Sequence, residues 1–168
     1  KMLLQKIDLK DFSSVLDLQT DINLIDFVDY ANEVKTLIED IGITSKKKEC
    51  LSLTEKLVNE NKKVVIWCIF VDSIRSIKAS LESMGIKAEC IMGEVALEDR
   101  IALTNAFKDG KYDVLITNPH TLAESVSLHH VCHDAIYYEY SYNLVHLLQS
   151  KDRIHRLGLK EGQYTQYY

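Results

Sequence analysis

The sequence predicts an α/β fold with a mainly parallel sheet and helices on both of its faces. From residue 62 onward, short apolar segments alternate with amphipathic segments of about 10–15 residues, which is the pattern of βαβ units. The segment VVIWCIF (64–70) is apolar at every position, as is typical of a strand buried on both faces. Because crossovers between parallel strands are right-handed, we expect helices to cover both faces of the sheet.

Each strand and helix of this fold can be assigned in order. Apolar segments predict strands at 64–70, 86–92, 112–117, 134–139 and 163–168. Helical spacing predicts helices at 72–84, 97–108 and 143–157, with a loop or short helix over 118–130. The helix at 72–84 has Asp72 or Ser73 as a candidate N-cap, and Gly85 is expected to end it. Ligands of such sheets bind beyond the carboxyl ends of the strands, so the loops near Phe70, Met92, Thr117 and Tyr140 are the ones to inspect.

Residues 1–44 are expected to form an acidic, partly helical extension or linking segment before the main domain, 45–168. The extension holds four lysines against nine acidic residues, a net charge of −5, whereas residues 45–168 hold 16 basic and 16 acidic residues. Helices are predicted at 22–40 and 46–60, the second with Thr44 or Ser45 as its N-cap. The neutral main domain neither excludes nucleic-acid binding nor indicates it through charge alone.

The composition predicts a cytoplasmic protein without a membrane partner. The longest apolar run has eight residues (64–71), far below the roughly 18 that a membrane span needs. Four cysteines occur without a CxxC pair, which favours a reducing compartment and no disulfide framework. No secretory pattern opens the sequence. Because it begins with Lys1 rather than with an initiator methionine, we expect a fragment of a longer protein.

The segment LLQSKDRIHRLG (147–158) raises the question of function. In a helix, Gln149, Asp152, Arg153 and Arg156 occupy positions i, i+3, i+4 and i+7 and share one face. Periodicity alone favours a solvated polar stripe with an Asp152–Arg156 pair. The alternative is a phosphate site, because guanidinium groups match the geometry of phosphate oxygens.

The pattern QxxDRxHRxG in this segment resembles motif VI of superfamily-two helicase-like ATPases, specifically bacterial DNA translocases of the Swi/Snf type. The resemblance implies the second, RecA-like three-layer lobe of such a motor. It further implies that Arg153 and Arg156 are catalytic groups that approach the nucleotide, with Arg156 as the arginine finger. Gln149 and Asp152 would then be nucleotide-binding residues.

Two further stretches resemble the same family, so that the resemblance covers about residues 45–168. The segment DVLITNPHTLAESVSLHHVCHDAIYYEYSYN resembles motif V and the strand after it, with Ala123 where the bacterial pattern has glycine. This match implies DNA-backbone contacts for Thr117 and Asn118, and nucleotide contacts for Glu124 and Ser125. The segments KVVIWCIFVDSIRSI and MGEVALEDR resemble motif IV and the glycine-to-arginine stretch after it, which adds Gly93 and Arg100 on the DNA side.

The chain has neither a GxxxxGK[ST] phosphate loop nor a nearby acidic magnesium motif. By the resemblance, ATP and Mg²⁺ are held mainly by a preceding RecA-like lobe of the same chain, and this lobe supplies arginines and grips duplex DNA. The isolated fragment is then expected to be inactive as an ATPase and to hold no cofactor. The alternatives are the second lobe of an RNA helicase or restriction-type translocase, or a non-catalytic α/β interaction module.

Two other clusters favour structural roles. His129, His130, Cys132 and His133 lie too close in sequence to form a tetrahedral zinc site without a distant second pair, so no metal is predicted. Alternating aromatic residues on a strand are usually half-buried, so packing is favoured over base stacking for Tyr137, Tyr138, Tyr140 and Tyr142.

Overall fold

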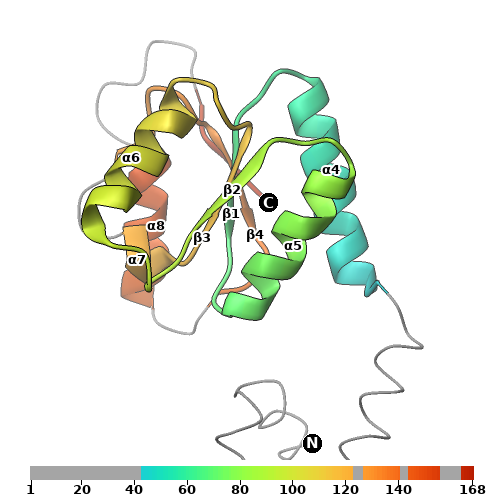
Figure 1. Ribbon diagram of the computed structural model, residues 1–168, viewed down its shortest axis with the longest axis horizontal. Coiled ribbons are helices and arrows are strands. Elements are labelled where there is room, and N and C mark those ends of the chain that lie inside the picture. Colours follow the sequence, from blue (N-terminus) through green and yellow to red (C-terminus); the bar gives the residue numbers. More distant parts are fainter. Residues whose placement is uncertain (1–42, 123–126, 141–143, 156–163) are drawn as a thin grey trace, which may run out of the picture. The chain divides into compact units, whose positions relative to one another are not determined.

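The computed structural model describes residues 43–122, 127–140, 144–155 and 164–168 (Figure 1). Residues from Ser45 to Tyr168 form one compact unit. The predicted helix at 22–40 and the rest of the acidic extension up to residue 42 lie outside the described residues. Within the described part, no helix is long and apolar enough to cross a membrane.

The described strands form one parallel sheet. They are β1 (Val64–Trp67), β2 (Ala88–Ile91), β3 (Val114–Thr117), β4 (Asp134–Tyr137) and β5 (Gln166–Tyr167), in the spatial order β2-β3-β1-β4-β5. Every strand pair is parallel, and Ile66 of β1 lies level with Ile116 of β3 and Ile136 of β4. The predicted strands are confirmed, although each is shorter than its apolar segment because the adjoining residues leave the ladder.

The helices follow the predicted order. They are α4 (Ser45–Asn59), α5 (Val71–Ser83), α6 (Leu97–Lys108), α7 (Pro119–Leu122) and α8 (Leu144–Ile154). The bounds of α6 are those predicted from its apolar spacing. The short helix α7 begins at the only proline of the chain, which lacks an N–H and is therefore tolerated in a first helical turn.

The sheet is the middle of three layers, with α4 and α5 on one face and α6, α7 and α8 on the other (Figure 1). Alternate residues of β1 face opposite sides: Ile66 packs with Leu57 and Ile77 under α4 and α5. Trp67 packs with Phe107 of α6 and Ile154 of α8 on the other side. All four residues of β1 are buried, so the prediction of a strand covered on both faces is confirmed.

The sheet has a topological switch point between β1 and β4. After β1 the chain passes through α5 toward β2 at one edge, and after β4 it passes through α8 toward β5 at the other edge. The helices α5 and α8 lie on opposite faces of the sheet (Figure 1). In open α/β sheets this switch point is where ligands bind.

The predicted cap at the start of α5 is wrong, whereas the predicted end is correct. Phe70 occupies the N-cap position without a side-chain hydrogen bond, and Asp72 and Ser73 lie inside the first turn. At the other end Gly85 has a φ of +78°, and the Ile86 N–H donates to the Leu81 carbonyl at 3.0 Å. A residue without a Cβ adopts this left-handed conformation at low cost, which is why the helix ends there.

A lysine before β1 holds the end of α6. Lys63 Nζ donates to the carbonyls of Phe107 and Lys108, the second at 3.0 Å, and lies 5.1 Å from the centre of the Phe107 ring. A cation at a helix C-terminus pairs with carbonyls that have no partner inside the helix. We expect Lys63→Met to lower the free energy of unfolding by about 1–2 kcal/mol in urea titrations. An equal loss in the exposed control Lys111→Met would contradict this assignment.

An ion pair between α5 and β2 should make stability depend on pH. Lys78 Nζ lies 2.5 Å from Glu89 Oε1. Burial raises the pKa of Glu89, but hydrogen bonds from Lys78 and the Cys90 N–H, together with the lysine charge, outweigh it and hold the pKa below its usual 4.5. Because the folded-state pKa is depressed, this contribution is present above pH 4.5 and is lost as the pH falls through the folded-state pKa.

We therefore expect Glu89→Gln to lower the free energy of unfolding by about 1 kcal/mol at pH 7, with the difference from the parent closing toward pH 3. Urea unfolding at both pH values, followed by the fluorescence of the single tryptophan, Trp67, measures it. The control Glu94→Gln removes an exposed carboxylate 3.8 Å from Arg75 and should leave stability nearly unchanged. A Glu89→Gln difference that is independent of pH would contradict the ion-pair account.

Candidate functional site

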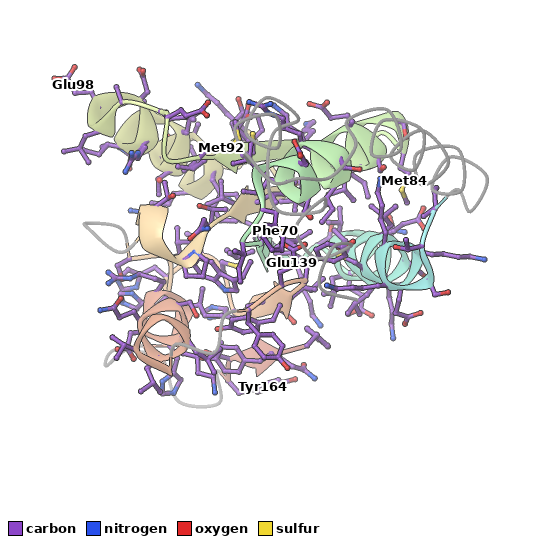
Figure 2. The ribbon with its side chains drawn as sticks, turned by 90° about the horizontal axis from the view of Figure 1, so that it is seen from below. Phe70, Met84, Met92, Glu98, Glu139 and Tyr164 are labelled. Carbon is purple, nitrogen blue, oxygen red and sulfur yellow. The ribbon has the colours of Figure 1, made fainter. Side chains whose placement is uncertain are left out.

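Glu139, two residues after β4, reaches the junction between β1 and α5 (Figure 2). Its carboxylate accepts hydrogen bonds from the backbone N–H groups of Ile69 (2.9 Å) and Phe70 (3.0 Å) and from the Ser73 hydroxyl (2.6 Å). Negative charge is favoured at a helix N-terminus, and these donors have no partner within the helix. The start of α5 is therefore capped by a side chain from another strand.

Asn118, directly after β3, joins the same junction from the opposite side of β1. Its Nδ2 donates to the Ile69 carbonyl at 3.1 Å. The Glu139 N–H in turn donates to the Trp67 carbonyl at 3.1 Å. The Ile69–Phe70 peptide group is thus held by Asn118, after β3, through its carbonyl and by Glu139, after β4, through its N–H. One hydrogen-bonded network joins the carboxyl ends of three neighbouring strands beside the switch point.

The structure places Thr117 inside the sheet. Its side chain is fully buried, and its Oγ1 donates to the Ile91 carbonyl at the end of β2 (2.9 Å). Its carbonyl accepts the Cys68 N–H at 2.9 Å. A hydroxyl with no exposed surface cannot touch a nucleic acid in this conformation. The predicted DNA contact of Thr117 is therefore corrected: the residue supports Asn118 from within the sheet.

The structure brings Arg100 and Gly93 together. The Arg100 guanidinium donates to the carbonyls of Gly93 (2.7 Å), Val95 (2.7 Å) and, more weakly, Thr121 (3.5 Å). These bonds fasten the loop between β2 and α6 to α7. A Cβ built on Gly93 meets only Thr121 Oγ1, at 4.0 Å, so the structure would accept alanine there. The geometry thus gives Arg100 an internal role in addition to any DNA contact.

Helix α8 carries two of the predicted nucleotide-binding residues, Gln149 and Asp152, on its exposed side. Gln149 and Asp152 are exposed, whereas Ser150 and Ile154 are buried against the sheet. Arg153 is partly buried near the helix end, and its carbonyl accepts the Leu128 N–H at 2.8 Å. The prediction that Gln149 and Asp152 share a face is confirmed. Arg153 differs because it lies toward the core side of that face.

A partly buried hydrogen bond joins α8 to the sheet. The hydroxyls of Tyr137 on β4 and Ser150 on α8 are 2.7 Å apart, and Ser150 also donates to the Leu147 carbonyl at 2.7 Å. The Tyr137 ring stacks on Trp67 with 6.4 Å between ring centroids. Burial raises the pKa of Tyr137, and the bond to Ser150 opposes that rise only partly. The tyrosine therefore acts as a neutral anchor for the helix.

Three predicted site residues lie outside the described residues: Glu124, Ser125 and Arg156. Of the others, Asn118 follows β3 directly, and Gln149, Asp152 and Arg153 lie together on α8. Helix α7, which comes directly after Asn118, packs against α8. The predicted DNA residue Asn118 thus leads into a helix that contacts the one carrying Gln149, Asp152 and Arg153.

The histidine-rich segment after residue 127 makes hydrogen bonds within the protein. Ser127 Oγ is hydrogen-bonded to His129 Nδ1, and the buried Cys132 donates through its thiol to the Lys63 carbonyl at 3.2 Å. Burial raises the pKa of the Cys132 thiol to about 12, which disfavours the thiolate that a metal needs. Within the described residues, no three ligand side chains gather in a metal-binding group.

The tyrosines at the end of β4 and after it differ in burial. Tyr137 and Tyr138 are partly buried, and Lys46 Nζ lies 4.3 Å from the centre of the Tyr138 ring. Packing is therefore confirmed for these two. Tyr140 is 67% exposed, so packing does not account for it, and Tyr142 lies outside the described residues.

Sequence reasoning missed Glu139 and Ser150 as parts of the site. Glu139 is the last residue of the predicted strand 134–139, where a charged residue is interpreted as an ordinary strand end. Its position at the carboxyl edge of the sheet was the available signal, because ligands of such sheets bind beyond that edge. Ser150 falls between motif residues on α8, and its role depends on the distant partner Tyr137.

Comparisons with known proteins agree with this architecture. The family model described as "Helicase conserved C-terminal domain" matches residues 45–158. No curated protein matches the chain. Among solved structures, the chain resembles one titled "Crystal structure of the C-terminal part of Fun30 ATPase domain", with a TM-score of 0.68 and 19% identity over 92% of this chain.

The likeness to that solved structure concerns the fold, and this chain spans 50% of its length. It supports the RecA-like three-layer fold predicted from motif VI and from the alternating elements. The family match begins at Ser45, where α4 begins, and extends past α8. The predicted resemblance to the second lobe of a helicase-like ATPase is therefore confirmed in family and fold: the chain belongs to the helicase conserved C-terminal domain family.

Proposed function

We propose that this chain is the second motor lobe of an ATP-dependent DNA translocase of the Swi/Snf type. The main support is the position of the QxxDRxHRxG segment. Its described part lies at the end of α8, beside the topological switch point of the parallel sheet. Gln149 and Asp152 are exposed there, and Arg153 stands at the end of the helix. A preceding RecA-like lobe would hold ATP and Mg²⁺, and α8 would close over the nucleotide.

The arginines supply positive charge to the transferring phosphoryl group. Charge spreads over the γ-phosphoryl oxygens in the transition state, and a planar guanidinium can donate two hydrogen bonds to them. Arg153 and Arg156 are assigned this role, with Arg156 as the finger. The two arginines would reach the nucleotide only when the two lobes close. ATP turnover would therefore be coupled to movement along DNA.

Nucleic acid would bind at the edge of the sheet formed by the carboxyl ends of the strands. Asn118 is a polar side chain directly after β3, on the network that joins three strand ends. We assign it to the phosphate backbone of one DNA strand, with the Gly93–Arg100 loop beside it as a second contact. Phosphate contacts are independent of sequence, which suits a protein that moves along DNA.

The choice of nucleic acid can be tested with the full-length protein. ATP turnover should be stimulated most by duplex DNA, less by single strands and least by RNA. Stimulation should also fall as salt rises, because backbone contacts release counterions. Stronger stimulation by RNA would replace this proposal with an RNA helicase, and no stimulation by any nucleic acid would favour a non-motor α/β module.

A further inference from the structure

Glu139 is the least expected charge at the proposed DNA edge. A carboxylate beside a phosphate-binding surface should repel its ligand, so simple electrostatics assigns it an unfavourable effect on DNA binding. Yet its two oxygens are occupied: one accepts the N–H groups of Ile69 and Phe70, and the other accepts the Ser73 hydroxyl. Figure 2 shows Glu139 beside Phe70, turned toward the β1–α5 junction.

The bond pattern connects Glu139 to Asn118 through one peptide group. In the Ile69–Phe70 peptide group, the Phe70 N–H donates to Glu139 at 3.0 Å and the Ile69 carbonyl accepts Asn118 Nδ2 at 3.1 Å. Bonds to an ionised carboxylate are about twice as strong as bonds between neutral groups. Fixing the Ile69 backbone from the β4 side therefore fixes the carbonyl that orients the Asn118 amide on the β3 side.

We infer that Glu139 is a positioning residue, which orients Asn118 for the DNA backbone by clamping the loop between β1 and α5. The inference rests on the proposed function, since it concerns the same DNA edge. It reverses the electrostatic expectation: removing this negative charge weakens the response to DNA. The side chain itself does not contact the nucleic acid.

The structural half of the inference can be measured on this chain by amide hydrogen exchange. In Glu139→Ala the N–H groups of Ile69 and Phe70 lose their acceptor and should exchange faster. The Cys68 N–H donates to the Thr117 carbonyl instead and should keep its protection, which makes it an internal control. Unchanged exchange at Ile69 and Phe70 would overturn the clamp.

The functional half uses the full-length protein, at a temperature where circular dichroism shows each variant folded. Glu139→Ala should raise the duplex-DNA concentration for half-maximal ATP turnover by about three- to ten-fold, with little change in KM for ATP. Glu139→Gln keeps an oxygen that can accept both N–H groups, so it should restore much of the response. Glu55→Ala is the matched control, because it removes an exposed carboxylate from α4, which carries none of the residues assigned to DNA or nucleotide.

The outcomes separate this inference from the proposed function. If Asn118→Ala raises the half-maximal DNA concentration and Glu139→Ala does not, the positioning role fails while the DNA edge stands. A lower half-maximal DNA concentration in Glu139→Ala would show that its charge only repels DNA, which also overturns the role. If the parent protein shows no response to DNA, the proposed function fails and takes the inference with it.

Discussion

Replacing Arg156 with alanine in the full-length protein is expected to lower DNA-stimulated ATP turnover by about 10³-fold or more. The guanidinium of an arginine finger acts on charge that develops in the transition state, so its loss lowers kcat far more than ATP affinity. Steady-state turnover, combined with equilibrium binding of a fluorescent ATP analogue, measures both effects. Arg156→Lys should stay strongly impaired, because an ammonium cannot form the planar two-pronged contact.

Arg75→Ala is the matched control for this experiment. Arg75 is an exposed arginine on α5, and its one ion pair within the described residues is a weak one of 3.8 Å with Glu94. Its removal should leave ATP turnover close to that of the parent. If Arg156→Ala behaves like Arg75→Ala, Arg156 belongs to a solvated stripe and the finger assignment is wrong.

The second large effect concerns the packing of α8. Ile154 is completely buried against Trp67 and Leu128, whereas Leu148 of the same helix is 50% exposed. We expect Ile154→Ala to lower the free energy of unfolding by about 2–5 kcal/mol, because it leaves a cavity in the core. Urea unfolding of this chain, followed by the fluorescence of Trp67, measures the change.

Leu148→Ala is the control. It should lower the free energy of unfolding by less than about 1 kcal/mol, because half of the Leu148 side chain is already exposed to water. The contrast tests how α8 is rotated about its axis, and hence which side carries Gln149 and Asp152. Equal losses at the two positions, or a larger loss at Leu148, would contradict the orientation of the helix described here.

The arrangement of the fold was predictable because its signals are local. All four residues of β1 are apolar. The spacing of apolar residues predicted the observed bounds of α6. Gly85 ended α5 where its left-handed conformation is needed. The start of α5 was not predictable in the same way, because its cap comes from Glu139, more than sixty residues later in the chain.

The candidate site was predictable in part for a similar reason. Motif VI placed Gln149 and Asp152 on one exposed helical face, which helical periodicity alone can specify. The buried state of Thr117 could not be read from its place at a strand end, because it depends on β2 supplying the Ile91 carbonyl. The position of α8 depends on Tyr137 and Ser150, a pairing that no sequence pattern indicates.

We propose that this chain supplies half of an ATPase site and that the preceding lobe supplies the other half. The most direct test compares ATP turnover by this chain alone, by the preceding lobe alone and by the full-length protein, each with duplex DNA. We predict DNA-stimulated turnover only when both lobes are present, with neither part active alone. Hydrolysis of ATP by this chain alone, or full activity of the preceding lobe without it, would contradict the claim.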